Sequence, residues 1–82
     1  MTRHYPKAMH QRDARALLYD GHPHRLRLWK LSNGEILTYH RAIPIGRYTR
    51  GALIRVRLEP SGQIRAFREI TLFEIDDIKI YL

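Results

Sequence analysis

The chain has no cysteine among its 82 residues. Neither a disulfide nor a thiolate-ligated metal centre can therefore hold the fold together. A chain of this length also buries a smaller share of its surface than a longer one, so its apolar core must be modest. We therefore expect its stability to come from a hydrogen-bonded sheet, or in part from self-association.

Long hydrophobic runs are also missing. No apolar stretch approaches the roughly 20 residues of a membrane-spanning helix. The first twelve residues, MTRHYPKAMHQR, lack the apolar centre of a signal peptide. We therefore expect a cytoplasmic protein that makes no membrane contact.

Motifs that carry catalysis are absent as well. The sequence has no nucleophile elbow, P-loop, zinc-protease helix or dinucleotide fingerprint. Asp13 or Asp20 beside His22 would make an acid–base pair, but nothing positions a nucleophile. His22 and His24 are two residues apart and could share a face, yet Pro23 separates them and no thiolate supports a site. We expect no enzyme activity, no metal and no cofactor.

Acidic residues are few, and this makes the chain basic. Eight acidic residues face 15 basic ones, a net charge of +7, and 12 of the basic residues are arginines. Residues 1–58 carry a balance of +9 and residues 59–82 a balance of −2. Arginine forks match phosphate geometry, so the composition is a hint of nucleic acid, although a genome rich in G and C would also raise the arginine content.

Short alternating stretches separated by turn residues predict a mainly β protein of five to seven short strands. We expect a small antiparallel barrel or strongly bent sheet, SH3-like or OB-like in general architecture. Residues 1–13 are predicted to be a flexible basic segment, and residues 14–82 a single small β domain. A short helix from Ala8 to Leu18 is an alternative, but a strand over residues 15–19 is favoured because Asp20-Gly21 follows as a turn.

Two outer hairpins are predicted. Strands at residues 25–31 and 36–41 flank Asn33-Gly34, a strong hairpin signal, and a two-residue turn would pair Trp29 with Thr38. Leu26, Leu28, Leu37 and Tyr39 would then share one face. Trp29 is expected in the core. Residues 42–52 are expected to cross the structure without regular pairing.

The last hairpin is predicted to turn at Asp76-Asp77. This places Glu74 opposite Lys79, and opposite charges across a strand pair favour that register. A bulge or sharp bend is expected near Arg68-Glu69, where the alternation of the preceding strand breaks.

The central hairpin is the main candidate for function. Ile54 and Val56 alternate with Arg55 and Arg57, which predicts one apolar and one basic face. A three-residue loop, Pro60-Ser61-Gly62, would keep like residues together after the turn. That register pairs Val56 with Ala66, Arg55 with Phe67, and Arg57 with Arg65.

Two like charges facing each other are destabilising, so this register requires an offsetting partner. Solvent with Glu59 or Glu69 nearby would suffice. An anion held by the arginines beside Phe67 is the functional alternative.

Basic residues interleaved with aromatics indicate a small module that binds DNA or RNA, largely without sequence preference, by arginine–phosphate contacts and stacking. The candidate nucleic-acid-binding residues are Arg27, Arg47, Tyr48, Arg50, Arg55, Arg57, Arg65 and Phe67.

Two other interpretations stay open. The C-terminal strand, IKIYL, would serve as a protein-interaction or homodimer edge if it lay at the border of a sheet. A basic adaptor or inhibitor that docks on an acidic protein would have the same charge.

Overall fold

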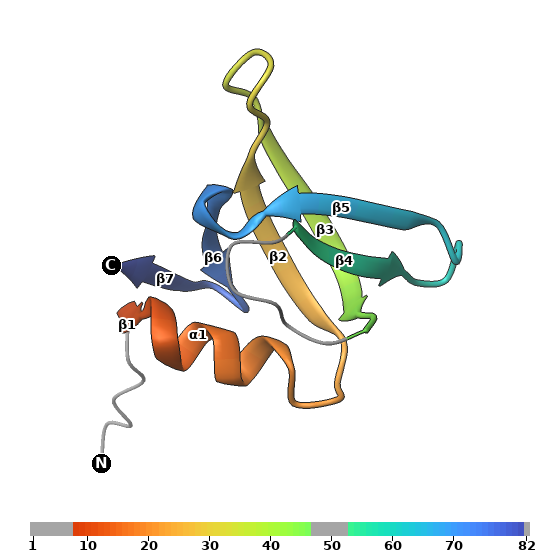
Figure 1. The fold of residues 1–82 in the computed structure, drawn as a ribbon, viewed down its shortest axis with the longest axis horizontal. Coiled ribbons are helices and arrows are strands. Elements are labelled where there is room, and N and C mark those ends of the chain that lie inside the picture. Colours follow the sequence, from red (N-terminus) through yellow and green to blue (C-terminus); the bar gives the residue numbers. More distant parts are fainter. Residues whose placement is uncertain (1–7, 47–52, 82) are drawn as a thin grey trace.

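One sheet of seven strands and a short helix form the part of the chain, residues 8–46 and 53–81, that the computed structural model describes (Figure 1). The strands lie in the order β1-β7-β6-β2-β3-β4-β5. The elements are β1 (Ala8–His10), α1 (Gln11–Leu18), β2 (His24–Trp29), β3 (Ile36–Pro44), β4 (Leu53–Leu58), β5 (Ile64–Arg68), η1 (Glu69–Thr71), β6 (Leu72–Ile75) and β7 (Ile78–Tyr81). The prediction of a mainly β protein is confirmed. In the described residues the sheet is open, because its end strands β1 and β5 do not pair with each other.

Helix α1 replaces the predicted strand at residues 15–19, so that prediction was wrong and the helical alternative was right. The His10 Nδ1 caps the helix by accepting a hydrogen bond from the Arg12 N–H at 3.0 Å. Ala14 and Leu18, four residues apart, are both buried. A strand would have turned Leu17 and Leu18 to opposite faces, whereas in the helix Leu17 packs against the same core as Ala14 and Leu18.

Strand β1 lies parallel to β7, with Met9 opposite Ile80. The described part of the N-terminal segment, residues 8–13, thus belongs to β1 and the start of α1. The division of the chain at residue 13 remains a prediction. Because β7 lies between β6 and β1, the C-terminal strand is not an edge of the described sheet, so the condition for edge pairing through it is not met.

The β2–β3 hairpin has the predicted faces in a different register. Trp29 pairs with Ile36 rather than with Thr38. The Lys30 N–H donates to the Glu35 carbonyl at 2.7 Å, which leaves a four-residue loop. A shift of two residues along one strand keeps every side chain on its face, so Leu26 and Leu28 still share a face with Leu37 and Tyr39, and both leucines are buried there.

The prediction that Trp29 lies in the core was wrong. Its side chain lies on the face opposite Leu28 and is 45% exposed. Its ring stacks on Phe73, with the ring centres 5.1 Å apart.

Of the remaining predictions for the connections between strands, one was wrong and two were confirmed. β3 runs to Pro44 and pairs with β4, so residues 42–44 are not an unpaired connection. The expected bend after Arg68 is present as the 3₁₀ turn η1. Asp76 and Asp77 both have positive φ, as in a type I′ hairpin turn, and Glu74 faces Lys79 as predicted.

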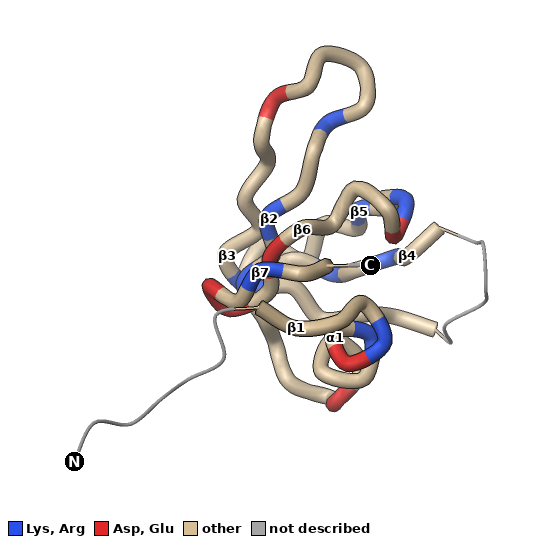
Figure 2. Tube along the Cα trace, turned by 90° about the vertical axis from the view of Figure 1, so that its left-hand side faces the viewer, with Lys and Arg blue, Asp and Glu red and all other residues tan. Residues whose placement is uncertain are grey.

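The core lies where the β4–β5 hairpin folds over β2 and β3 (Figure 1), with α1 beside β1 and β7 (Figures 1 and 2). Apolar side chains from every part of the sheet meet there. Its buried members are Ala14, Leu18, Leu26, Leu28, Ala42, Ile54, Val56, Phe67, Leu72 and Ile75.

Candidate nucleic-acid interface

The β4–β5 hairpin has a four-residue loop, not the expected loop of three. The Leu58 N–H donates to the Gln63 carbonyl at 2.8 Å, and the Gly62 N–H donates to the Leu58 carbonyl at 2.7 Å. Val56 is therefore opposite Arg65, one residue away from the predicted partner Ala66. The predicted register was wrong.

Burial of one side chain accounts for the difference. Phe67 lies opposite Ile54 and is only 6% exposed, whereas every other residue of β5 is exposed. In the predicted register Phe67 would lie opposite Arg55 and face solvent. An aromatic side chain buries about 150–250 Å², far more than Ala66, so the observed register removes more apolar surface from water.

This register changes two parts of the predicted binding face. Phe67 packs against Tyr39, with ring centres 6.5 Å apart, so it is not an exposed stacking platform. Arg57 lies opposite Ile64, so the expected Arg57–Arg65 pair does not exist. The Arg65 guanidinium instead bonds to the Gln63 Oε1 at 2.7 Å and to the Ile64 carbonyl at 3.0 Å.

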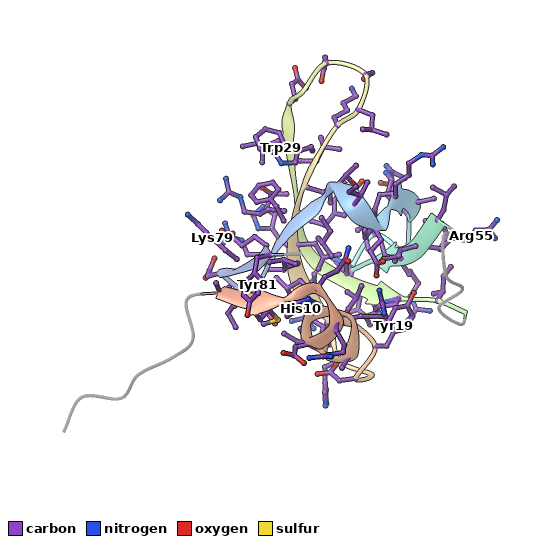
Figure 3. The ribbon with its side chains drawn as sticks, turned by 60° about the vertical axis from the view of Figure 1, so that its left-hand side comes forward. His10, Tyr19, Trp29, Arg55, Lys79 and Tyr81 are labelled. Carbon is purple, nitrogen blue, oxygen red and sulfur yellow. The ribbon has the colours of Figure 1, made fainter. Side chains whose placement is uncertain are left out.

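The solvent face of the hairpin is nevertheless basic. Two arginines of β4 and one of β5 lie on it, separated by apolar side chains at the paired positions. We call this face the arginine surface; its residues are Leu53, Arg55, Arg57, Ile64, Ala66 and Arg68. Figure 3 shows Arg55 pointing outward on the side of the molecule opposite Lys79.

The three arginines of this surface have no carboxylate partner within ion-pair distance among residues 8–46 and 53–81. Other arginines do. The ion pairs are Arg15–Glu69 at 3.0 Å, Arg25–Asp77, Arg27–Glu74 at 3.4 Å and Arg41–Glu59 at 3.4 Å. Glu59 and Glu69, expected as local partners for the arginine face, are therefore each bonded to another arginine.

Arg27 is not part of the arginine surface. Its guanidinium lies 5.5 Å from the centre of the Phe73 ring, and its side chain pairs with the buried Glu74. The position in the middle of β2, on the side of Trp29, explains this separation. Arg47, Tyr48 and Arg50 lie outside the described residues.

His24 forms a cluster with two aspartates that the sequence did not predict. His24 is 6% exposed, with its Nε2 at 2.8 Å from the Asp20 Oδ1 and its Nδ1 at 2.5 Å from the Asp76 Oδ2. The Arg25 N–H also donates to the Asp76 Oδ1 at 2.9 Å. The cluster joins the turn after α1, the start of β2 and the β6–β7 turn, so it ties together segments that are 52 residues apart in sequence.

The environment of this cluster shifts two pKa values. Burial of the His24 ring disfavours its charged form, but hydrogen bonds to Asp20 and Asp76 outweigh burial and raise the pKa of His24 above its usual 6.5. The His22 backbone N–H, followed by the His24 side chain, lowers the pKa of Asp20 below its usual 3.8. The expected Asp20–His22 pair thus exists only as a backbone hydrogen bond of 2.8 Å, and the carboxylate meets His24 instead.

The spacing of Asp20 and His24 could have suggested their contact from the sequence, because both flank one turn. Asp76 could not, since it comes from the opposite end of the chain. No group of three or more potential metal ligands that could hold an ion occurs in the described ranges.

Comparison with known proteins adds nothing to this geometry: no family model, curated protein or solved structure matches the chain. No helix in the described part of the chain is long and apolar enough to cross a membrane.

Proposed function

We propose that this protein binds DNA or RNA through the arginine surface of the β4–β5 hairpin, largely without sequence preference. The carrying observation is that its three exposed arginines lie on adjacent strands without a carboxylate partner among the described residues. Such cations attract a polyanion, since their charge is not cancelled locally. Four other arginines of the described residues, Arg15, Arg25, Arg27 and Arg41, are paired with carboxylates, so their charge is compensated locally.

The spacing of the arginines supports contacts with a backbone. Arg55 and Arg57 are two residues apart on one strand, so their Cα atoms are separated by about 7 Å. Both side chains point to the same side and can contact different phosphates of one strand. Contacts of this kind position a nucleic acid without reading its bases.

The stacking part of the original hypothesis needs a different aromatic residue. Phe67 is buried and is dropped from the interface. Tyr48 takes its place in the proposal, with Arg47 and Arg50 as additional phosphate contacts, because these three residues lie in the segment that leads into β4. Arg65 is opposite Val56 on the other face of the hairpin, so it is dropped from the interface as well.

An open seven-stranded sheet lacks the closure of an SH3-like or OB-like barrel. The proposal therefore rests on the chemistry of the surface and not on either architecture.

The test is a fluorescence-anisotropy titration of labelled 20-nucleotide DNA and RNA strands with the wild type and with Arg57→Glu. Arg12→Glu is the matched control, because it changes the net charge equally at an exposed position on α1. Arg57→Glu should weaken binding strongly, while Arg12→Glu should leave it nearly unchanged. Equal losses in both variants would mean that only the total charge matters, and undetectable binding of the wild type at low salt would refute the proposal.

The same titration decides between nucleic acid and an acidic protein surface. Poly-glutamate of similar charge serves as the competitor. If it displaced the oligonucleotides at equal charge concentration, a basic adaptor for acidic proteins would be the better interpretation.

A further inference from the structure

A groove separates the β2–β3 hairpin from the end of β5. Its volume is about 260 Å³, and most of its lining is apolar. Leu31, Leu37 and Tyr39 line it from the β2–β3 hairpin, and Ala66, Phe67 and Arg68 line it from β5. Three successive strand residues alternate between the two faces of a sheet, so their joint presence indicates that the groove follows the edge of β5.

This edge is open in the described structure. β5 is the last strand of the sheet in the described residues, and among them it pairs with β4 alone (Figure 1). The Leu58–Gln63 hydrogen bond and the Ile45 N–H bond to the Arg55 carbonyl, at 2.9 Å, set the alternation of the β4–β5 ladder. By that alternation the backbone groups of Ala66 point away from β4, as do those of Ile64 and Arg68.

Only some of these outward-pointing backbone groups form hydrogen bonds with other described residues. The Ile64 carbonyl accepts from the Arg65 guanidinium at 3.0 Å, and the Arg68 carbonyl accepts from the Thr71 hydroxyl at 2.7 Å. No described protein group bonds to the outward N–H and carbonyl of Ala66, which is itself exposed. Such an unpaired pair of groups at the middle of an edge strand is a template for another strand.

The charge of the groove restricts what that strand can be. Lys30 and Arg68 are its charged lining residues, and no acidic side chain lines it. Neither cation has an ion-pair partner among the described residues. The wall also carries exposed apolar side chains, with Leu31 at 70% and Leu53 at 55% exposure.

We propose that an extended segment of a partner protein, with alternating apolar and acidic side chains, adds to β5 as an eighth strand. Its backbone bonds to Ala66, its apolar side chains enter the groove, and its carboxylates meet Lys30 and Arg68. Edge addition of this kind takes affinity from main-chain hydrogen bonds and specificity from alternate side-chain pockets.

Two other occupants fit less well. The groove is smaller than the roughly 300–1,000 Å³ of most small-molecule sites, but it can take side chains of a peptide. A second copy paired through β5 would bring two basic strands side by side, each with Arg65 and Arg68, and their like charges repel. This site is the edge of β5 and goes beyond the arginine surface, which is the face of the same hairpin.

The test uses the ¹⁵N-labelled full chain and the peptide acetyl-Glu-Val-Glu-Leu-Glu-Val-Glu-amide. Binding should shift the amide signals of Ala66 and Arg68 and of the groove residues Leu31 and Tyr39, and should slow hydrogen exchange at Ala66. Ala66→Pro removes the outward donor at a position where an edge strand tolerates proline. It should weaken binding about tenfold, the factor expected for one net hydrogen bond.

Backbone-methylated peptides test the proposal without altering the protein. In an added strand only every second N–H faces β5. Methylation of the odd-numbered peptide nitrogens and of the even-numbered ones should therefore give opposite results, with one peptide inactive and the other active.

Three outcomes would overturn the proposal. Equal binding of both methylated peptides, or shifts confined to Arg55 and Arg57, would show that the peptide acts only as a polyanion, which leaves the nucleic-acid proposal intact. Self-association of the chain that Ala66→Pro abolishes would make a second copy the occupant. Oligonucleotide binding that fails while the peptide binds refutes the proposed function alone.

Discussion

Arg55 on β4 lies directly opposite Ala66 on β5. The carbonyl of Arg55 accepts a hydrogen bond from the Ile45 N–H on the β3 side, so this is a pair without mutual hydrogen bonds. Such pairs bring their Cα atoms to about 4.5 Å in an antiparallel sheet. The Arg55–Ala66 relationship determines both surfaces proposed for this protein, because it places arginines on the face of the hairpin and free backbone groups on its edge.

The register can be tested with a disulfide. The double variant Arg55→Cys and Ala66→Cys should oxidise spontaneously, because the Cα distance of such a pair lies within the range of disulfides. Mass spectrometry after alkylation would detect the bridge. Arg57→Cys with Arg65→Cys is the control, since these side chains now point to opposite faces. Preferential bridging of the control pair would contradict the observed register.

The salt dependence of oligonucleotide binding measures how many residues of the arginine surface contact a phosphate. If Arg55, Arg57 and Arg68 each contact one phosphate, log K for single strands should fall against log salt with a slope contribution of about −2 from these contacts. Replacing any one of them by alanine should make the slope shallower by about 0.7. A slope that does not change in Arg55→Ala would remove that residue from the interface. The measurement is the same anisotropy titration at a series of salt concentrations.

The His24 cluster predicts a pH optimum of stability. The raised pKa of His24 means that its contribution is complete below about 6.5 and is lost as the pH rises through the folded-state pKa. The lowered pKa of Asp20 means that its contribution is present above 3.8 and is lost on acidification. Stability should therefore be highest between these limits.

Urea unfolding of the wild type and of His24→Gln would measure this effect. The wild type should lose free energy of unfolding above neutral pH, and the variant should not show that loss. An identical alkaline decline in both proteins would exclude His24 as its source. Asp20→Asn should remove the acid-side contribution of that carboxylate.

Alanine substitution of a buried residue of β2 should lower the free energy of unfolding more than alanine substitution of a half-exposed one. Leu26 is 0% exposed, so Leu26→Ala should lower the free energy of unfolding by about 2–5 kcal/mol. Trp29→Ala should cost about 1 kcal/mol, because it removes mainly the ring contact with Phe73. Chemical denaturation gives both values. Trp29 is the single tryptophan of the chain, and its fluorescence should be readily quenched by acrylamide; a shielded tryptophan would contradict its half-exposed position.

A glycine in the β6–β7 turn should preserve or slightly raise the thermal stability. Asp77 has φ +68°, a conformation that glycine adopts without strain. Asp77→Gly removes an exposed ion pair with Arg25, which contributes about 0–1 kcal/mol, but relieves a left-handed residue that costs about 1–2 kcal/mol. The thermal midpoint should stay equal or rise slightly. Asp76→Gly should lower it, because Asp76 also bonds to His24 and to the Arg25 N–H.

The local pattern of the sequence was sufficient to predict some features of the fold. The alternation of β2 determined that Leu26 and Leu28 share a face, because a slip of two residues cannot change that. The facing charges of Glu74 and Lys79 and the two aspartates at the turn determined the last hairpin. The mainly β class and the alternating faces of β4 followed from the same period.

Other features were decided by contacts between distant segments. β5 took its register because burying Phe67 against Ile54 and Tyr39 removes more apolar area than the simple alternation would. Residues 11–18 form a helix in which Leu17 packs against the same core as Ala14 and Leu18, whereas a strand would turn Leu17 to the opposite face. The pairing of Asp76 with His24 requires two ends of the chain to meet.

The two candidate surfaces show the same division. The sequence by itself determined that Arg55 and Arg57 share a face, since residues two apart on a strand always do. Tertiary structure decided that no carboxylate of the described residues is within ion-pair distance of them, because Glu59 and Glu69 bond to Arg41 and Arg15. It also decided that β5, and not β7, is at an edge of the described sheet. Pairing partners come from the order of strands in the sheet, and that order depends on which apolar faces can be buried together.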